Sequence, residues 1–459
     1  MNTLPEEIIC HIVNNLENTF DVINFSMSNK YYRNLIIKNK EIFNCITTIN
    51  NKYINVLYKL NIIGKLKVNL SYNENIVDIS MLKNCQEVDI SYCKKIIDVS
   101  MLSKVKKLNL CRCINIRDVS MLGYVEELNL SRCDNISDIS RLGNVKKLNL
   151  YGCKKILDFS MLGNCIELNL SFCNIVDVSM LGDVEILDLS NNDKIKDVSM
   201  LGKVKKLNLT RCYNISNVSN LGNLEELDLS FCYKISDVSM LWKIKKLNLS
   251  WNDNITDISN LGNVQELNLS YCTNIKDVSM LDKVKKLNLL GCYNIINVSS
   301  LGNCEELNLS HCVNVKDVSN LGNCEELNLS HCHNIKDVSM LGKVKKLNLS
   351  ECYNITDVSS LGNCEELNLS QCYRITDVSM LGKVKKLNLS DCYNIKDVSN
   401  LINVKKLNLS YCKNISDVSM LVNCIELYLY GCDGIKDVSM LKSVNILKKW
   451  FWINYHNFK

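Results

Sequence analysis

Hydrophobic and polar residues follow a pattern that recurs about every 20 residues from residue 66 to residue 447 of this 459-residue chain. In a typical unit the apolar positions are Val204, Leu207, Leu209, Cys212, Ile215, Val218 and Leu221. Leu207 and Leu209 are two residues apart, so they share the buried face of a short strand, with Lys206 and Asn208 on the other face. The pattern predicts nineteen strands, from residues 66–70 to residues 426–429, and one unit, Ser171–Leu189, has 19 residues instead of 20.

The spacing Leu-x-x-Leu-x-Leu-x-x-Cys/Asn resembles the leucine-rich repeat. The resemblance implies an α/β repeat solenoid, a curved leucine-rich-repeat array of about 19 twenty-residue coils. A parallel sheet would line its inner face, and the array would occupy residues 66–447.

Between the strand and the end of each unit lies the segment Asp-Val-Ser-x-Leu-Gly, which predicts a capped helical or 3₁₀ turn. Asp or Ser can accept hydrogen bonds from the free N–H groups at the start of such a turn. Asp holds this position in seventeen units, and Asn217 and Asn297 replace it in the other two, as a capping role permits. The Gly that follows is expected to leave the turn with φ > 0.

The ninth position of each unit is Cys in sixteen copies and Asn in three. This interchange predicts a ladder of side chains that hydrogen-bond the buried loop backbone. Its members include Cys93, Cys113, Cys212, Cys232, Cys312, Cys332, Asn73, Asn192 and Asn252. Disulfides are disfavoured by the parallel side-chain vectors, and zinc at His311-Cys312 or His331-Cys332-His333 is the less favoured alternative to buried structural thiols. We therefore expect no metal and no cofactor.

The outward strand positions carry Lys-Lys and Glu-Glu pairs that alternate between neighbouring coils. Opposite charges on adjacent strands attract, so the simplest interpretation is a ladder that fixes strand order. The alternation also argues against nucleic-acid binding, which requires continuous positive charge. It breaks at two places, where uncompensated charge would offer partner-binding candidates: Glu305, Glu306, Glu325, Glu326, Lys385, Lys386, Lys405 and Lys406.

The position before the Cys ladder is the variable one within the motif. Aromatic and Arg side chains on an exposed edge resemble a protein-binding hot spot. Phe231, Trp251 and Tyr271 lie in consecutive coils and would form one aromatic strip, with surface drift in a duplicated array as the alternative. Further target-binding candidates at this position are Arg112, Arg132 and Arg211.

Composition places few limits on function. The chain is 47% hydrophobic and 22% charged, which excludes disorder, and its net charge of +5 does not indicate a nucleic-acid partner. No stretch approaches the ~18 apolar residues of a membrane span. The opening MNTLPEEIICHIV lacks the basic and apolar regions of a signal peptide, and recurrent Asn-Leu-Ser would be glycosylated on secretion. We therefore expect an intracellular protein, cytoplasmic or nuclear.

Residues 1–44 fall outside the repeat and predict a small all-α domain. Leu-Pro-x-Glu-Ile, an apolar helix and a close of Ser-Asn-Lys-Tyr-Tyr-Arg resemble an F-box. The resemblance implies binding to a Skp1-like protein through Leu4, Pro5, Ile8, Ile9, Ile12 and Leu16. A plain helical cap over the first coil is the alternative. Residues 45–65 are expected to be a helical linker and N-terminal cap, and the aromatic residues 448–459 a C-terminal cap.

Together the two resemblances imply an F-box/leucine-rich-repeat protein, the substrate receptor of a Skp1–cullin–F-box ubiquitin ligase. Its partners would be a Skp1-like protein, a cullin and an unknown target protein, with no membrane and no small-molecule substrate. No catalytic motif is evident, so we expect no enzymatic activity. The Asn-, Ile- and Lys-rich composition further points to a giant DNA virus that infects amoebae. The alternative is a binding or decoy protein that delivers nothing to a ligase.

Overall fold

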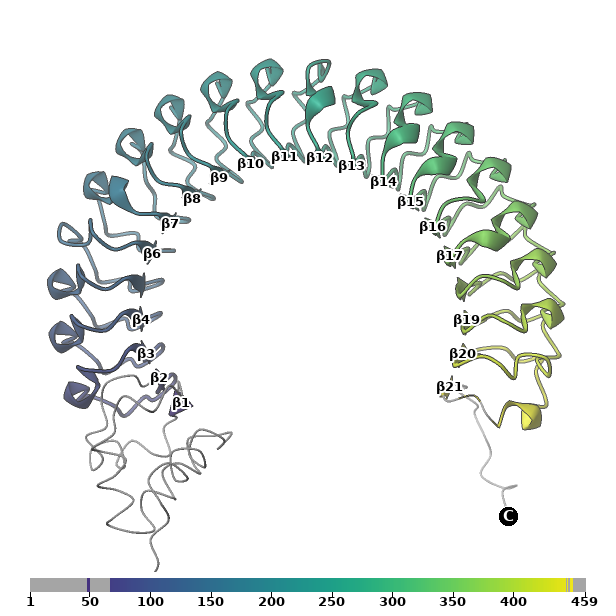
Figure 1. The fold of residues 1–459 in the computed structure, drawn as a ribbon, viewed down its shortest axis with the longest axis horizontal. Helices are drawn as coiled ribbons and strands as arrows, with labels where there is room; N and C mark the ends of the chain where they lie inside the picture. The colour runs from purple at the N-terminus through teal and green to yellow at the C-terminus, as the bar shows by residue number, and fades with distance from the viewer. Residues whose placement is uncertain (1–47, 50–66, 443, 445, 449–459) are drawn as a thin grey trace, which may run out of the picture. The chain divides into compact units, whose positions relative to one another are not determined.

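The computed structural model describes residues 48–49, 67–442, 444 and 446–448. The chain divides into two compact units, residues 1–215 and residues 216–459. Within each unit the described chain winds in successive coils. Each coil contributes one short strand to a parallel sheet on the inner side of the curve, with the turns on the outer side (Figure 1). The predicted leucine-rich-repeat solenoid is confirmed.

The first unit holds nine described strands, each two or three residues long. They are β1 (Thr48–Ile49), β2 (Lys67–Asn69), β3 (Glu87–Asp89), β4 (Lys107–Asn109), β5 (Glu127–Asn129), β6 (Lys147–Asn149), β7 (Glu167–Asn169), β8 (Ile186–Asp188) and β9 (Lys206–Asn208). The 3₁₀ helices on its outer side are η2 (Ser80–Leu82), η3 (Ser100–Leu102), η4 (Ser120–Leu122), η5 (Ser160–Asn164), η6 (Ser179–Leu181) and η7 (Ser199–Leu201).

The second unit repeats the arrangement with twelve described strands. They are β10 (Glu226–Asp228), β11 (Lys246–Asn248), β12 (Glu266–Asn268), β13 (Lys286–Asn288), β14 (Glu306–Asn308), β15 (Glu326–Asn328), β16 (Lys346–Asn348), β17 (Glu366–Asn368), β18 (Lys386–Asn388), β19 (Lys406–Asn408), β20 (Glu426–Tyr428) and β21 (Ile446–Lys448). Its 3₁₀ helices are η8 (Ser219–Leu221), η9 (Ser239–Leu241), η10 (Leu261–Asn263), η11 (Ser279–Leu281), η12 (Ser299–Asn303), η13 (Ser319–Asn323), η14 (Ser339–Leu341), η15 (Ser359–Asn363), η16 (Ser379–Leu381), η17 (Ser399–Leu401) and η18 (Ser439–Leu441).

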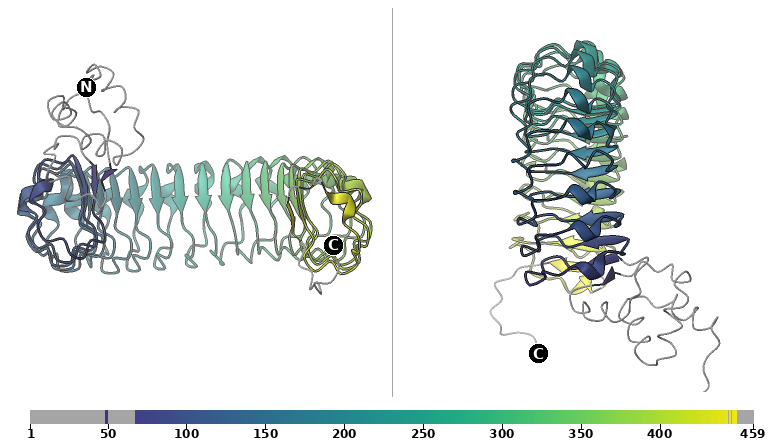
Figure 2. Two further views of the ribbon diagram at one scale, coloured as in Figure 1. Left: turned by 90° about the horizontal axis from the view of Figure 1, so that it is seen from below. Right: turned by 90° about the vertical axis from the view of Figure 1, so that its left-hand side faces the viewer.

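Neighbouring strands run in the same direction (Figure 2), and they pair in strict register. Glu127 lies opposite Lys147, and Leu128 lies opposite Leu148. Two strands were not among the nineteen predicted. β1 pairs with β2 and falls in the segment 45–65, for which a helical linker was predicted, so that prediction is wrong for residues 48–49. A short parallel strand there gives the edge of β2 a partner. β21 pairs with β20 and continues the array at its other end.

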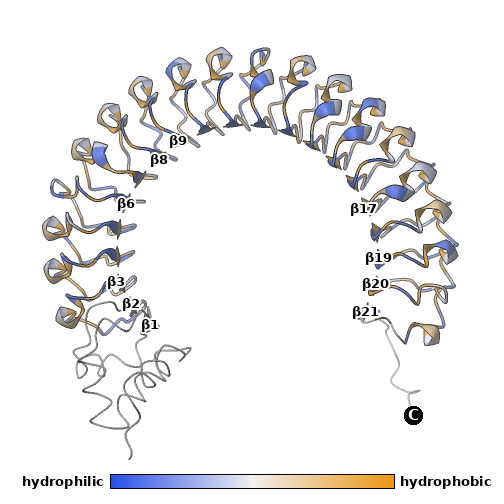
Figure 3. Ribbon diagram, viewed as in Figure 1, coloured by the Kyte–Doolittle hydropathy of each residue, from blue (hydrophilic) through white to orange (hydrophobic). Residues whose placement is uncertain are grey.

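The core runs through the middle of every coil. Leu209, Cys212, Ile215 and Leu221 are fully buried, and Leu207 is nearly so. Hydrophobic and hydrophilic residues alternate along each coil (Figure 3), because one side chain in every two or three faces this core. Among the residues that the structure describes, no helix has the length and apolar character needed to cross a bilayer.

The turn before each 3₁₀ helix is capped as predicted. In the coil of η9, Asp237 Oδ1 accepts a hydrogen bond from the backbone N–H of Ser239 at 2.9 Å. The two Asn residues at this position accept the same bond, Asn217 from Ser219 and Asn297 from Ser299, both at 3.0 Å. The bond is present in all nineteen predicted coils.

The glycine that follows this turn has a different purpose from the one predicted. Gly123 has φ −62°, an ordinary right-handed value, so the expected exit with φ > 0 is wrong. A Cβ atom on Gly123 would lie 2.1 Å from the carbonyl oxygen of Arg141, and one on Gly222 would lie 2.1 Å from that of Met240. Glycine is therefore used where the backbone of the next coil approaches closely.

The Cys/Asn ladder is confirmed in its geometry. Cys212 Sγ donates to the carbonyl oxygen of Leu189 at 3.3 Å, and Asn252 Nδ2 donates to that of Leu229 at 2.8 Å. Both side chains reach back to the end of the preceding strand, which is why a weak donor and a strong one can interchange. Burial raises the pKa of Cys212 to about 12, so the thiol stays protonated at physiological pH.

Candidate functional site

The most variable residues form a row at the carboxyl ends of the strands, which we call the edge row. Each residue lies just before the Cys/Asn ladder and has a left-handed backbone, with φ near 60°. Its members are Tyr72, Tyr92, Arg112, Arg132, Gly152, Phe172, Asn191, Arg211, Phe231, Trp251, Tyr271, Gly291, His311, His331, Glu351, Gln371, Asp391, Tyr411 and Gly431. Sixteen of these nineteen residues are not glycine, although L-residues disfavour this conformation.

Backbone contacts hold the edge row in this conformation. Asn248, the last residue of β11, accepts a hydrogen bond on its side-chain oxygen from the N–H of Ser250 at 3.1 Å. The N–H of Trp251 then donates to the carbonyl oxygen of Ser270 in the next coil at 2.9 Å. Because these bonds involve the backbone and a recurrent Asn, the edge-row side chain is free to vary.

The predicted aromatic strip is present in the second unit. Phe231 stacks on Trp251 with a ring-centroid distance of 5.3 Å, and Trp251 stacks on Tyr271 at 4.1 Å. Trp251 is 41% exposed. The strip ends at Gly291, where a Cβ atom would lie 2.7 Å from Cδ1 of Tyr271. Glycine at that position therefore leaves room for the tyrosine ring.

The predicted arginines of the edge row lie in the first unit. The Arg112 guanidinium lies 5.3 Å from the ring centroid of Tyr92, which itself stacks on Tyr72 at 4.3 Å. Arg132 lies over the ring of Tyr151 at 4.9 Å and donates to its hydroxyl at 3.1 Å. Such cation–π contacts hold both arginines in place. Arg211 occupies the edge row of the same unit.

A second ring ladder, which was not predicted from the sequence, lies beside the edge row. It contains His333, Tyr353, Tyr373 and Tyr393, with successive centroid distances of 4.6, 5.2 and 5.3 Å. Each of these residues directly follows a ladder cysteine. The recurrence of an aromatic ring at that position every 20 residues was the signal that could have revealed it.

Glu351, a member of the edge row, connects the edge row to the second ring ladder. Its carboxylate lies 3.1 Å from His331 Nδ1 and accepts a hydrogen bond from the Tyr353 hydroxyl at 2.7 Å. That bond raises the pKa of Tyr353 to about 12. His311 stacks on His331 at 4.0 Å, and burial, reinforced by the neighbouring imidazole, lowers the pKa of His311. No group of three or more metal-ligating side chains that could hold a metal ion occurs among the described residues.

The predicted charge ladder on the inner face forms ion pairs between neighbouring coils. Lys107 pairs with Glu127 at 3.0 Å, and Lys246 pairs with Glu266 at 3.1 Å. These side chains are half exposed, so water and salt screen each pair and its contribution to stability is small. The ladder serves strand order more than stability.

The two breaks in the alternation do not collect uncompensated charge to the extent predicted. Glu306 does lie opposite Glu326, but each glutamate has a lysine on its other side. The pairs at the two breaks are Glu305 with Lys285, Glu306 with Lys286, Glu325 with Lys345, Glu326 with Lys346, Lys385 with Glu365, Lys386 with Glu366 and Lys406 with Glu426. Within the described residues Lys405 alone of the eight candidates makes no ion pair, because its neighbour in the next coil is Ile425.

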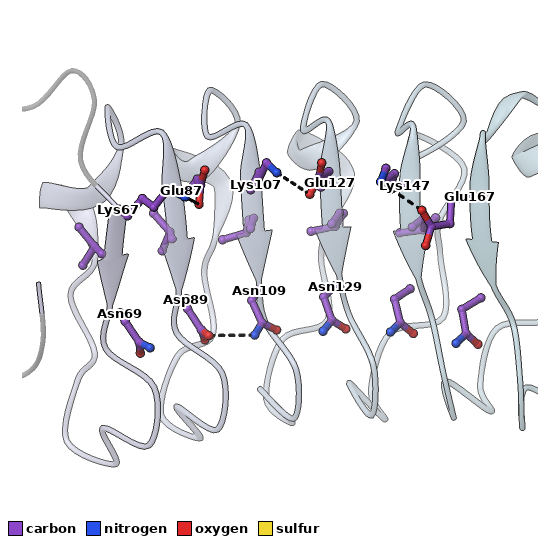
Figure 4. Close-up of a pocket in the computed structure, with 17 residues that line it drawn as sticks. Lys67, Asn69, Glu87, Asp89, Lys107, Asn109, Glu127, Asn129, Lys147 and Glu167 are labelled. Carbon is purple, nitrogen blue, oxygen red and sulfur yellow. Dashed lines mark hydrogen bonds and ion pairs between the residues drawn. The ribbon is translucent and has the colours of Figure 1, made fainter. Parts of the chain in front are cut away.

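A shallow groove of about 510 Å³ runs along the inner face of the first unit (Figure 4). Charged side chains from Lys67 to Glu167 form a row along one side of the groove, and Asn and Asp side chains from Asn69 to Asn169 form a row along the other side. Lys107 and Lys147 reach the carboxylates of the next coil, and Asn109 donates to Asp89 at 3.0 Å. Val and Leu side chains, among them Val88 and Leu108, line the groove between these polar residues. The lining holds no catalytic constellation of acid, base and nucleophile.

The residues predicted to bind Skp1 lie outside the described residues: Leu4, Pro5, Ile8, Ile9, Ile12 and Leu16. The predicted F-box at 1–44 also lies there, as does the C-terminal cap predicted at 448–459 apart from Lys448, the last residue of β21. Both stay predictions. The viral origin stays a prediction as well.

Comparison with known proteins supports the class of the fold. Residues 243–258 match the family model described as Leucine Rich repeat. No curated protein matches the chain. Together with the repeated coil, the match identifies the architecture as that of leucine-rich-repeat proteins.

Several solved structures are similar to this chain. An internalin, InlF, from Listeria monocytogenes shares 22% identity, with 81% of this chain and 95% of that chain covered, at a TM-score of 0.39. The functional domain of Listeria monocytogenes InlJ, which includes a cysteine ladder, shares 19% identity over 72% and 73%, at 0.44. A leucine-rich-repeat protein of Leptospira interrogans shares 19% identity over 85% and 97%, at 0.41.

Proposed function

We propose that this protein is a non-enzymatic scaffold that binds a target protein through the aromatic strip Phe231–Trp251–Tyr271. The observation that carries the proposal is the stacking of three large rings in consecutive coils, with Trp251 exposed and Phe231 and Tyr271 half-buried, on a backbone held by hydrogen bonds. Aromatic side chains that are already ordered lose little conformational freedom on binding, and they dominate the energetics of protein interfaces.

The test compares two tryptophans with the same exposure but different positions. Trp251 is 41% exposed on the edge row, and Trp242 is 40% exposed at the end of η9 on the outer side. The proteins that co-purify with the wild-type chain from cells would be quantified against Trp251→Ala and Trp242→Ala. We expect the specific set to fall at least tenfold with Trp251→Ala only. Equal losses with both variants, or with neither, would contradict the proposal.

We further propose that the scaffold delivers its target to a Skp1–cullin–F-box ubiquitin ligase as the substrate receptor. The support is the F-box-like sequence of residues 1–44, which predicts an apolar helix that begins near Leu4, Pro5 and Ile8 and would suit a groove on Skp1. In this arrangement the chain holds the target and the cullin-bound enzymes carry out the chemistry.

This second step has its own experiment. Purified chain and the double variant Leu4→Ala/Pro5→Ala would be mixed with Skp1 and cullin, and the complex would be isolated. We expect the wild type to form the complex and the double variant to lose it. A well-folded wild type that binds no Skp1 would leave a solenoid binding protein. Skp1 binding without target ubiquitination in a reconstituted ligase would indicate a decoy.

A further inference from the structure

The charge ladder on the inner face of the first unit is interrupted at β7 and β8. Ile166, just before β7, and Ile186, the first residue of β8, occupy positions that carry charged residues in most other coils. They are 43% and 39% exposed, and the N–H of Ile186 donates to the carbonyl oxygen of Ile166 at 2.9 Å. Two large apolar side chains therefore lie on adjacent coils of an otherwise charged surface.

Acidic residues alternate with these isoleucines. Glu167 follows Ile166 along one strand, and Glu185 precedes Ile186 along the next. Each glutamate is paired with the lysine on its outer side, Glu167 with Lys147 at 3.2 Å and Glu185 with Lys205 at 2.7 Å. We call Ile166, Glu167, Glu185 and Ile186 the checkerboard patch.

Lysine pairs flank the checkerboard patch on both sides. Lys146 and Lys147 lie on the preceding coil, and Lys205 and Lys206 on the following one. Four ammonium groups thus lie beside two carboxylates in the four coils from Lys146 to Lys206, and the glutamate pairs Glu126-Glu127 and Glu225-Glu226 lie on the coils beyond them. An apolar centre with a charged border is the layout of a protein-binding hot spot.

We propose that the checkerboard patch binds an extended segment of a partner protein with the pattern acid–x–apolar–x–acid. This inference rests on the proposed protein-binding function and names the chemistry of the partner. Adjacent strands lie ~4.8 Å apart, so three strand steps separate the two lysine pairs by roughly 14 Å. An extended chain that crosses the strands places residues i, i+2 and i+4 on one face at about 0, 7 and 14 Å.

The spacing of the lysine pairs and the isoleucines therefore matches that of residues i, i+2 and i+4 in an extended segment. The two acidic residues of the segment would face the two lysine pairs, and the apolar residue would lie between Ile166 and Ile186. Apolar burial would supply most of the affinity, whereas the charges would set the register and exclude segments of the opposite charge.

The variants that test this inference replace the two exposed isoleucines by charged residues like those of the other coils, and leave the buried core unchanged. Position 166 lies between Lys146 and Glu185, and position 186 lies between Glu167 and Lys206. In the double variant Ile166→Glu/Ile186→Lys each new side chain therefore gains one opposite charge and one like charge as neighbours. Because these contacts offset each other, we expect this double variant to unfold close to the temperature of the wild type. The matched control is Ile425→Glu, which changes a 45% exposed isoleucine beside Lys405 in the other unit.

The probe is a phage-displayed library of random 12-residue peptides, selected on the full-length wild-type chain. We expect the enriched peptides to carry the acid–x–apolar–x–acid pattern. Their synthetic versions should bind Ile425→Glu like the wild type and lose at least tenfold in affinity for the Ile166→Glu/Ile186→Lys variant.

Enriched peptides that lack the pattern, or that bind the folded double variant as well as the wild type, would overturn the inference. Peptides that lose affinity with Trp251→Ala instead would overturn it and leave the proposed function standing. A dimer in sedimentation experiments that the double variant abolishes would show that the occupant is a second copy of the chain, which also overturns it. If no peptide is enriched, the inference fails, and the comparison of Trp251→Ala with Trp242→Ala still tests the proposed function on its own.

Discussion

Individual side chains of this protein owe their positions to the backbone of the neighbouring coil. Trp251 has φ 64°, a conformation that costs a non-glycine residue about 1–2 kcal/mol in isolation. Its N–H nevertheless finds a carbonyl oxygen in the next coil at 2.9 Å. The adjacent coils also determine whether Cys or Asn suits a position of the Cys/Asn ladder. The side chain there must form hydrogen bonds with the backbone groups that those coils leave unpaired.

Asn192 should therefore be much harder to replace than Asn252. Asn192 Oδ1 accepts from the N–H groups of Cys173 and Ile175, at 3.0 and 3.2 Å, where the 19-residue coil closes. Within the described residues Asn252 Oδ1 has no hydrogen-bond partner. We expect Asn192→Cys to lower the free energy of unfolding by about 2–3 kcal/mol, because two buried N–H groups lose their acceptor, and Asn252→Cys by less than about 1 kcal/mol. Urea unfolding followed by circular dichroism measures both, and equal effects would contradict the argument.

The ladder thiols should not react while the chain is folded. Burial raises the pKa of Cys212 and of Cys272 to about 12, so at pH 8 only about one molecule in ten thousand carries the thiolate. Cys111 lies outside the ladder and is half-buried. In a variant with Cys10 and Cys45 replaced by serine, we expect a thiol-specific reagent to label Cys111 first, and the ladder only in denaturant. Mass spectrometry of the labelled peptides would detect any early ladder labelling, which would count against this account.

At the scale of the element, each 3₁₀ turn depends on the carboxylate or carboxamide placed two residues before its first N–H. This side-chain-to-backbone hydrogen bond recurs in every predicted coil. Asn and Asp share the position because both present an oxygen acceptor at the same distance from the backbone.

The cap at η9 allows a direct test of this interpretation. Asp237→Ala removes the 2.9 Å bond to Ser239 and should lower the free energy of unfolding by about 0.5–2 kcal/mol. Asp237→Asn is the matched control, since Asn217 fills the same role one coil earlier, and it should be close to neutral. Thermal unfolding of the three proteins distinguishes the cases. A loss with Asn as large as that with Ala would mean that charge, not hydrogen bonding, holds the turn.

Most of the coil was predictable from sequence because it depends on period and residue type. Leu207 and Leu209 mark the strand, Asp237 marks the cap, and the interchange of Cys212-type and Asn252-type residues marks the ladder.

The left-handed edge row was not predictable, since Trp251 and Phe231 carry no local signal for φ > 0. The neighbouring coil imposes that conformation. Gly123 was misread for the same reason: the close contact that requires glycine comes from Arg141, eighteen residues further along.

At the scale of the whole molecule, the small contributions of each coil to the folding stability add up along the chain. The hydrogen bond from the backbone N–H of the following serine lowers the pKa of Asp237, and the same cause lowers the pKa of Asp337, Asp397 and the capping aspartates of most other coils. A carboxyl whose pKa is lower in the folded state stabilises the fold at pH values above its unfolded pKa, near 4. That contribution is lost as the pH falls through the lowered folded value.

We therefore expect resistance to urea to be nearly constant from pH 7 to pH 5 and to fall steeply below pH 4. The fall should be steeper than a single carboxylate allows, because many equivalent groups take up protons together. Urea midpoints at intervals of half a pH unit would measure it. A midpoint that stays constant down to pH 3 would show that the caps contribute no pH-dependent stability.

The alternating charges of the inner face also limit how such an array can grow. A duplication of two coils preserves the Lys–Glu alternation, whereas a duplication of one coil places two like charges side by side. Residues 301–312 and 321–332 have identical sequences, and between them Glu306 lies opposite Glu326. The identical sequences and the like-charge contact between them therefore indicate that a single coil was duplicated when the chain was lengthened.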